Sequence, residues 1–199
     1  MKYNKNILIL GGDSGLGKYL AKFFIKKKFN VFISHKTKTK KEKKNFFYLD
    51  YNRLKKFDLN LKKKINNAKL DYVLFLAAIT TGSKQTNNVK GIFGNLELQE
   101  FVKFLNINCF APIKIFEILK KKNFLKKNSK IIFFSSLAGS ITKRGNLKHN
   151  KPFGNMIYRM SKSALNCGVK NLSYDFQKEH IIISLHPGFV KTKNGGVRI

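Results

Sequence analysis

The sequence predicts one α/β domain built on a parallel sheet that carries helices on both faces. Short runs that are apolar throughout alternate along the chain with stretches of helical spacing. A wholly apolar run is typical of a strand buried on both faces, as the strands of parallel sheets are. A length of 199 residues suits one domain with one core. We see no internal repeat and no linker, so residues 1–199 are assigned to a single domain.

Six strands and four helices account for most of the chain. The apolar runs predict strands over Asn6–Leu10, Asn30–Ser34, Phe46–Leu49, Asp71–Ala78, Lys130–Phe134 and Ile181–Leu185. The segments between them predict helices over Gly15–Lys28, Arg53–Ala68, Asn95–Asn123 and Met156–Lys178. We expect Asn95 to cap the third helix and Pro112 to kink it. The order of elements predicts a three-layer α/β/α arrangement of the doubly wound type.

The charge of the chain favours contact with nucleic acids at first sight. The formal net charge is +31, from 41 Lys+Arg against 10 Asp+Glu. The bases are nearly all lysine and are spread along the chain, and no nucleic-acid-binding motif accompanies them. Frequent Asn, Ile, Phe and Tyr indicate the codon bias of an AT-rich genome. We therefore expect only non-specific attraction to RNA or DNA, with a dedicated nucleic-acid function as the weaker alternative.

The sequence does not support a metal-binding, disulfide-rich, secreted or membrane-spanning protein. Cys109 and Cys167 lie far apart and form neither a metal-binding pattern nor a disulfide framework, which favours a reducing compartment. We expect no metal site. The first apolar run is too short for a signal peptide or a membrane span, and no later run reaches that length. The sequence therefore predicts a soluble, cytoplasmic protein.

Glycines follow the first predicted strand, where a helix begins. Gly11 allows a tight turn, Gly15 lets the backbone approach a pyrophosphate, and Gly17 lets helix and strand pack closely. The helix N-terminus would add N–H donors for the phosphates. The pattern predicts a dinucleotide site of the Rossmann type, and an ordinary glycine-rich turn is the alternative. The expected contacts are Gly11, Asp13, Ser14, Gly15, Leu16 and Gly17.

The end of the second predicted strand bears on the choice of dinucleotide. An NAD site usually has an acid there to bind the ribose hydroxyls. This chain has Ser34-His35-Lys36 and no acid before Glu42. The absence of an acid predicts NADP(H), with Lys36 and His35 as contacts of the 2′-phosphate, while NAD(H) stays open.

Tyr158 and Lys162 stand four residues apart on a predicted helix, so their side chains share one face. A phenol ordinarily has a pKa near ~10, and a neighbouring ammonium favours its ionised form. We expect Lys162 to lower the pKa of Tyr158, so that the phenol exchanges protons with a carbonyl or an alcohol near neutral pH.

Several motifs occur together in one order along the chain. After the glycine turn come Asn108-Cys109-Phe110-Ala111-Pro112, Ser135-Ser136-Leu137-Ala138-Gly139-Ser140-Ile141, Tyr158-Arg159-Met160-Ser161-Lys162-Ser163-Ala164-Leu165-Asn166, and His186-Pro187-Gly188-Phe189-Val190-Lys191-Thr192. Over essentially its whole length the chain resembles the short-chain dehydrogenase/reductase family. It is most similar to the carbonyl-reductase-like branch that includes the C-factor and sniffer proteins.

The resemblance implies an oxidoreductase that transfers hydride between a nicotinamide and a small carbonyl or alcohol. It implies Tyr158 as the acid/base, Ser136 as the group that polarises the substrate oxygen, and Lys162 as the holder of the nicotinamide ribose. Asn108, which fits the family's Asn-x-x-Gly-Pro better than Asn106 does, would anchor a water. The remaining cofactor contacts implied are Asp50 at the adenine, Ala77 and Ala78 after the fourth strand, and Pro187, Gly188, Val190 and Thr192 at the nicotinamide.

The chain departs from the family pattern at three places. Leu10 replaces the usual Thr, and Leu76-Ala77-Ala78-Ile79 replaces Asn-Asn-Ala-Gly. Little follows the Pro-Gly step, so the resemblance implies that the family's carboxyl-terminal seventh strand is missing. These departures keep an alternative open, namely an NADP-binding sensor or signalling protein with little turnover. The family implies either a homodimer through the two long helices or a monomer. The sequence does not name the substrate.

Overall fold

The computed structural model describes residues 5–13, 15–36, 45–80, 93–145, 156–188 and 190. They contain a six-stranded sheet in the order β3-β2-β1-β4-β5-β6, and every pair of neighbours is parallel. The strands are β1 (Asn6–Leu10), β2 (Asn30–His35), β3 (Phe46–Tyr48), β4 (Leu70–Phe75), β5 (Leu125–Phe134) and β6 (His180–Leu185). The predicted fold class is confirmed.

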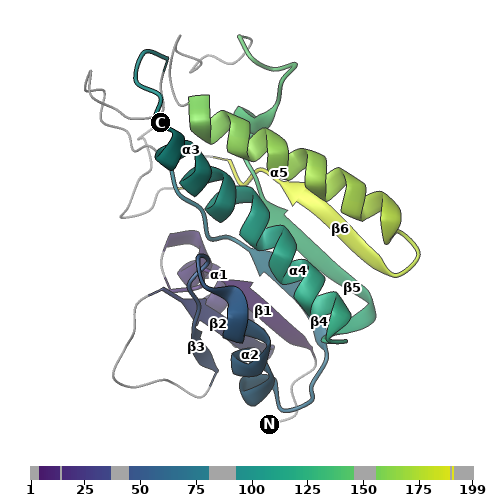
Figure 1. Cartoon of the computed structure of the whole chain (residues 1–199). Helices are drawn as coiled ribbons and strands as arrows, with labels where there is room; N and C mark the ends of the chain where they lie inside the picture. The colour runs from purple at the N-terminus through teal and green to yellow at the C-terminus, as the bar shows by residue number, and fades with distance from the viewer. Residues whose placement is uncertain are drawn as a thin grey trace.

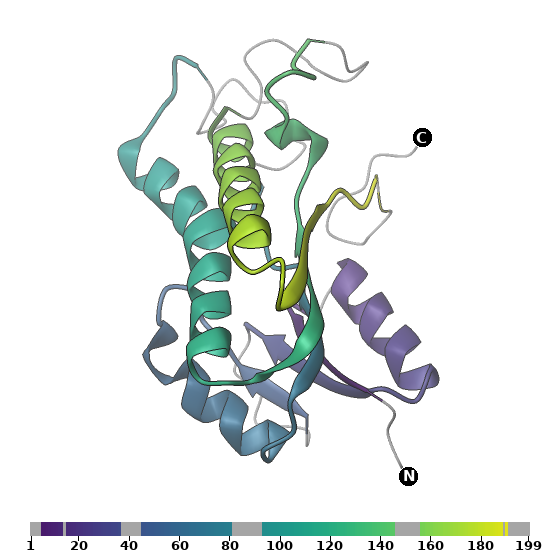
Figure 2. The same ribbon diagram turned by 90° about the vertical axis from the view of Figure 1, so that its right-hand side faces the viewer.

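Helices cover both faces of this sheet (Figures 1 and 2). α1 (Gly15–Lys26) packs on one face. The other face carries α2 (Phe57–Ile65), α4 (Ala111–Lys121) and α5 (Met156–Asp175), and α3 (Leu98–Leu105) leads into α4. Among the described residues, no helix is both long enough and apolar enough to cross a membrane.

Two apolar clusters fill the spaces between the layers. Ile7 and Ile9 of β1 pack with α1, whereas Leu8 and Leu10 join the larger cluster beneath α2, α4 and α5. All four side chains are fully buried. Successive residues of a strand point to opposite faces, so a strand covered on both sides needs apolar residues at every position. This requirement explains the unbroken apolar runs of the sequence.

β4 is shorter than the sequence predicts, because it ends at Phe75 instead of Ala78. The N–H groups of Leu76 and Ala77 both donate to the carbonyl of Leu10, at 3.0 and 3.1 Å. Two donors on one acceptor cannot continue a regular ladder, so the chain leaves the sheet at this point.

The predicted long helix over Asn95–Asn123 begins later and is interrupted. α3 starts at Leu98 with Glu97 at its N-cap, so the prediction that Asn95 caps this helix is wrong. Between α3 and α4 lies a π-helical turn, η2 (Asn106–Phe110). Pro112 has no N–H to donate to the Asn108 carbonyl four residues earlier. Instead, Ala111 donates to Asn106, five residues earlier. The predicted disturbance at Pro112 therefore takes the form of a widened turn.

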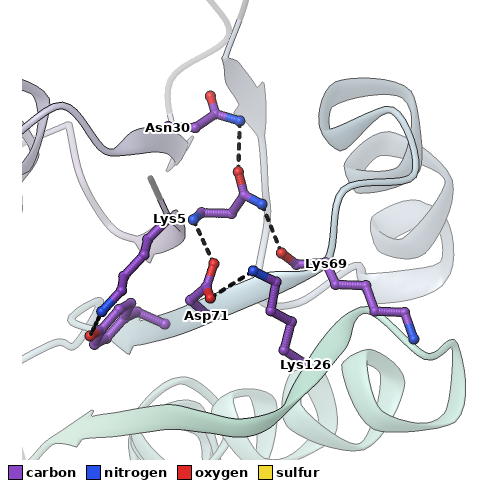
Figure 3. A network of polar contacts seen from close by, with 7 residues as sticks. Lys5, Asn30, Lys69, Asp71 and Lys126 are labelled. Carbon is purple, nitrogen blue, oxygen red and sulfur yellow. Dashed lines mark hydrogen bonds and ion pairs between the residues drawn. The ribbon is translucent and has the colours of Figure 1, made fainter. Parts of the chain in front are cut away.

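Polar side chains tie the amino ends of the strands together (Figure 3). The Asp71 carboxylate accepts from the backbone N–H of Asn6 and from Nζ of Lys126, both at 2.8 Å. The Asn6 amide donates to the Lys69 carbonyl at 2.9 Å and accepts from the Asn30 amide at 3.0 Å. Asp71 thus connects β1, β4 and the start of β5 at the edge opposite the predicted site.

We predict that Asp71→Ala lowers the free energy of unfolding by about 1–2 kcal/mol, because a strand N–H and an ammonium both lose their acceptor. Urea denaturation followed by circular dichroism measures this change. The matched control is Asp175→Ala, at an exposed position of α5, which should leave stability within about 0.5 kcal/mol of the parent. Equal stability of the two variants would refute the bracing role of Asp71.

Candidate active site

The predicted site residues that the structure describes gather at the carboxyl ends of the strands. The sheet continues from β1 through β2 to β3 on one side and from β4 through β5 to β6 on the other. In open α/β sheets, ligands bind at the carboxyl edge where the strand order reverses in this way. The turn after β1 and the segment after β4 both reach this point.

The turn after β1 leaves no room for side chains at two of its glycines. Gly11 has a φ of +89°, and a Cβ there would lie 2.9 Å from the backbone nitrogen of Ala77. A Cβ on Gly17 would lie 2.1 Å from the carbonyl oxygen of Gly11. This crowding agrees with the turn and packing roles predicted for both residues. Gly15, with a φ of +49°, is exposed where α1 begins.

Ser34, to which no role was assigned from the sequence, supports this turn from β2. Ser34 is buried, and its hydroxyl accepts from the Gly11 N–H at 3.0 Å. Its carbonyl accepts from the Gly12 N–H at 3.2 Å. Of the other predicted phosphate contacts, Asp13 is exposed, Leu16 is half-buried and Ser14 lies outside the described residues.

The two residues predicted to meet a 2′-phosphate lie in different surroundings. His35 is the last residue of β2 and is 6% exposed, with its ring against the rings of Phe46 and Tyr48. Lys36 follows it and is exposed. Of the two predicted contacts, Lys36 is therefore the exposed one, while His35 packs against aromatic rings. The side chain of Asp50, the predicted adenine contact, accepts from the N–H of Asn52 at 2.9 Å, a local contact two residues along the chain.

Asn108 holds the segment that follows β4. Its side-chain oxygen accepts from the Ile79 N–H at 2.8 Å, and its amide donates to the Ile79 carbonyl at 2.9 Å. The same amide donates to the Ser161 hydroxyl of α5 at 3.0 Å. Asn108 and Ser161 are both buried. Asn108 of η2 thus holds the segment in which the family's asparagines are missing. Within that segment, Ala77 lies against Gly11 and Ala78 is exposed.

Ser136, Tyr158 and Lys162 come together at the end of β5. Ser136 follows this strand, and its hydroxyl is hydrogen-bonded to that of Tyr158 from α5. Nζ of Lys162 lies 6.0 Å from the centre of the Tyr158 ring and donates to the Phe134 carbonyl at 3.0 Å. A serine hydroxyl, a phenol and an ammonium group therefore share one corner of the sheet edge.

Burial dominates the ionisation of this group. Burial raises the pKa of Tyr158, and the hydrogen bond with Ser136 acts in the opposite direction. Burial also lowers the pKa of Lys162 to about 8. The prediction that Lys162 lowers the pKa of Tyr158 is wrong. The physical reason is that loss of water around the phenol raises its pKa, while the Lys162 ammonium is bound to the Phe134 carbonyl.

The segment after β6 completes this edge. β5 and β6 are still paired here, because the Ser135 N–H donates to the Leu185 carbonyl at 2.8 Å. Pro187 and Gly188 are exposed, Gly188 has a φ of +74°, and Val190 is half-buried. Thr192 lies outside the described residues. The predicted contacts at Pro187, Gly188 and Val190 therefore follow β6 at the expected edge.

Comparison with known proteins agrees with this architecture. Residues 5–197 match the family model of short-chain dehydrogenases. An uncharacterised oxidoreductase of Saccharomyces cerevisiae is 37% identical over 89 residues, which are 44% of this chain and 32% of the yeast protein. C-signal of Myxococcus xanthus is 29% identical over 104 residues, which are 52% of this chain and 59% of that protein. Each match thus spans less than two thirds of the relative.

Solved structures share the fold at low sequence identity. A short-chain dehydrogenase/reductase of Burkholderia multivorans with bound NADP superposes with a TM-score of 0.75 and is 21% identical. The superposition covers 96% of this chain and 82% of that one. The match along nearly the whole sequence and the shared fold agree. The chain belongs to the short-chain dehydrogenase family.

Proposed function

We propose that this protein is an NADP-dependent oxidoreductase that transfers hydride between the nicotinamide and a small carbonyl compound or alcohol. One observation carries the proposal, namely the hydrogen-bonded pair Ser136–Tyr158 with the Lys162 ammonium beside the ring. Family membership supports it. An alternative is a sensor that binds NADP with little turnover.

The residues at the switch point fit a dinucleotide. Side chains at Gly11 and Gly17 would collide with backbone, so the turn keeps a bare surface where a pyrophosphate would lie. Gly15 opens the N-terminus of α1 to solvent, where N–H groups favour phosphate. Exposed Lys36, with no acid at the end of β2, favours the 2′-phosphate of NADP. The related fold of the Burkholderia protein holds NADP.

The proton chemistry follows from the surroundings of Tyr158. When bound, the nicotinamide supplies or accepts the hydride. In the reducing direction Ser136 donates a hydrogen bond to the substrate oxygen, and Tyr158, kept protonated by its raised pKa, gives that oxygen a proton. Hydride on carbon and this proton on oxygen complete the alcohol. The Lys162 ammonium, close to the ring, stabilises the phenolate that remains.

The proposal includes a path for replacing the proton. Pro112 leaves the Asn108 carbonyl without its usual helical donor. That carbonyl lies in η2, beside α5, to which the Asn108 side chain is tied through Ser161. We assign it the role of holding a water that passes protons toward Lys162.

The proposal extends to partners and location. Exposed apolar side chains lie along the two long helices: Leu98, Val102 and Phe110 in α3 and η2, and Met160 in α5. They support the predicted homodimer through these helices. A cytoplasmic location stays a prediction.

Tyr158→Phe should lower kcat for NADPH-dependent carbonyl reduction by at least about 100-fold, because the proton donor is lost. The measurement is NADPH absorbance with a panel of aldehydes and ketones. Tyr174→Phe is the matched control, since Tyr174 lies on the same helix and is 71% exposed. Full activity of Tyr158→Phe would exclude the mechanism. Cofactor binding by the parent without turnover of any compound would favour the sensor.

Lys162→Met should raise the free energy of unfolding at pH 7 by about 2 kcal/mol, because a buried charge is removed. The pKa of Lys162 is lowered from 10.5 to about 8 in the folded state. Between these values the unfolded chain holds a proton that the folded chain has released, so the parent gains stability as pH rises. The advantage of Lys162→Met should therefore shrink above pH 8.

Urea denaturation at several pH values measures this difference. The matched control is Lys170→Met, at an exposed position of α5, which should show no such pH dependence. A destabilised Lys162→Met protein at pH 7 would contradict the cost assigned to the buried ammonium.

Lys36→Ala should weaken NADPH binding about tenfold, or about 1.4 kcal/mol, and leave NADH binding unchanged. The reason is that only NADPH carries the 2′-phosphate. Titration calorimetry with both cofactors measures the two affinities. Lys178→Ala, in the exposed turn before β6, is the control for net charge. Equal weakening of both cofactors would remove Lys36 from the 2′-phosphate site.

A further inference from the structure

The turn that carries Ser136 is fastened to α5. This turn, η3 (Leu137–Gly139), follows Ser136 directly, and the Ser136 hydroxyl accepts from the Ala138 N–H at 3.1 Å. The Gly139 carbonyl accepts from the Ser163 hydroxyl at 3.0 Å and from the Asn166 amide at 3.3 Å. The position of the Ser136 hydroxyl thus depends on how η3 sits on α5.

Asn166 also reaches β6. Its side-chain oxygen accepts from the Ser184 hydroxyl at 2.7 Å. Ser184 lies near the end of β6, two residues before His186 and three before Pro187. One amide therefore joins α5, the serine turn and the strand that leads into the Pro-Gly step.

The backbones of η3 and α5 are in close contact at Gly139. A Cβ on Gly139 would lie 2.7 Å from the carbonyl carbon of Lys162 and 2.9 Å from the Asn166 amide nitrogen. With backbone against backbone, a small displacement of η3 would break these contacts or clash. The hydrogen bonds from Ser163 and Asn166 to the Gly139 carbonyl therefore hold η3 at a set distance from α5 and in a set orientation.

Asn166 lies on the side of α5 that carries Tyr158 and Lys162. Tyr158, Lys162 and Asn166 are spaced four residues apart, so they follow one another along one side of α5. Asn166 is half-buried there, one helical turn beyond Lys162. The helix that carries the phenol and the ammonium thus also carries the group that holds the serine turn.

We propose that Asn166 is a positioning residue, which sets the Ser136 hydroxyl against Tyr158 by anchoring η3 and β6 on α5. The inference rests on the proposed function. It assigns Asn166 no contact with substrate or cofactor. A purely structural role for Asn166 would change stability without depending on Ser136.

A double-mutant cycle tests the dependence on Ser136. Asn166→Leu should lower kcat about tenfold, with the KM for NADPH within about twofold, because only the geometry at the reacting oxygen is disturbed. In a Ser136→Ala background the same change should have no further effect on kcat. Asn171→Leu, at an exposed position of the same helix, is the matched control and should leave kcat unchanged. Equal losses in both backgrounds would overturn the proposal.

A second readout does not require turnover. The hydrogen bond with Ser136 lowers the pKa of Tyr158. Ser136→Ala and Asn166→Leu should each raise that pKa, and the two changes together should raise it no further. NMR titration of ring-labelled tyrosine measures it, with the Tyr158 signal assigned by its loss in Tyr158→Phe. An unmoved Tyr158 titration in Asn166→Leu would refute the positioning role.

The two readouts separate the possible failures. If the parent reduces no carbonyl but Tyr158 titrates as expected, the proposed function falls and the positioning role stands. If Asn166→Leu does not fold, Asn166→Asp replaces it, since it keeps the acceptor for Ser184 and removes the donor to Gly139. Normal kcat and an unmoved Tyr158 titration in that variant would refute the proposal.

Discussion

The site depends on the hydrogen bonds made by the buried side chain of Asn108. Its amide group pairs with both backbone groups of Ile79 and donates to Ser161. These three bonds connect η2, the segment after β4 and α5. The segment after β4 in turn backs Gly11 at the glycine turn. Loss of this one side chain would leave the N–H and the carbonyl of Ile79 without these partners, at about 1–3 kcal/mol for each.

The geometry of Asn108 has its origin in a proline four residues later. Pro112 lacks an N–H, and η2 widens by one residue before α4 begins. A π-helical turn of this kind commonly marks a functional site, because it redirects side chains within a helix. Here it brings the Asn108 side chain against Ile79, and Pro112 leaves the Asn108 carbonyl without its usual helical donor. One residue without a donor thereby helps to place Asn108 against the segment after β4.

The chemistry is obtained at the expense of stability. Lys162 is 2% exposed, and burial moves its pKa to about 8. The fold holds this ammonium with the Phe134 carbonyl, in a place where an apolar side chain would be more stable. Functional sites often carry such groups, since their reactivity requires surroundings that a stable core would avoid.

Much of this fold could be predicted from the sequence, because local signals are strong where strands are wholly apolar. The six strands, the glycine turn and the Tyr158–Lys162 pair could all be predicted, because each has a signal within a short stretch of sequence. The early end of β4 and the extension of β5 back to Leu125 could not be predicted, since they depend on partners in other strands. Ser34, Ser161 and Asn166 were missed for the same reason. Each acts on a residue at least 18 positions away, and spacing along one helix does not reveal such partners.

The central claim is that this edge of the sheet transfers hydride to a carbonyl carbon and a proton to its oxygen. Its most direct test uses NADPH that carries deuterium at C4 of the nicotinamide, labelled on one face and then on the other. Mass spectrometry of the alcohol product should find deuterium on the carbinol carbon for one of the two labels and not for the other. An alcohol without carbon-bound deuterium from either label would contradict this account.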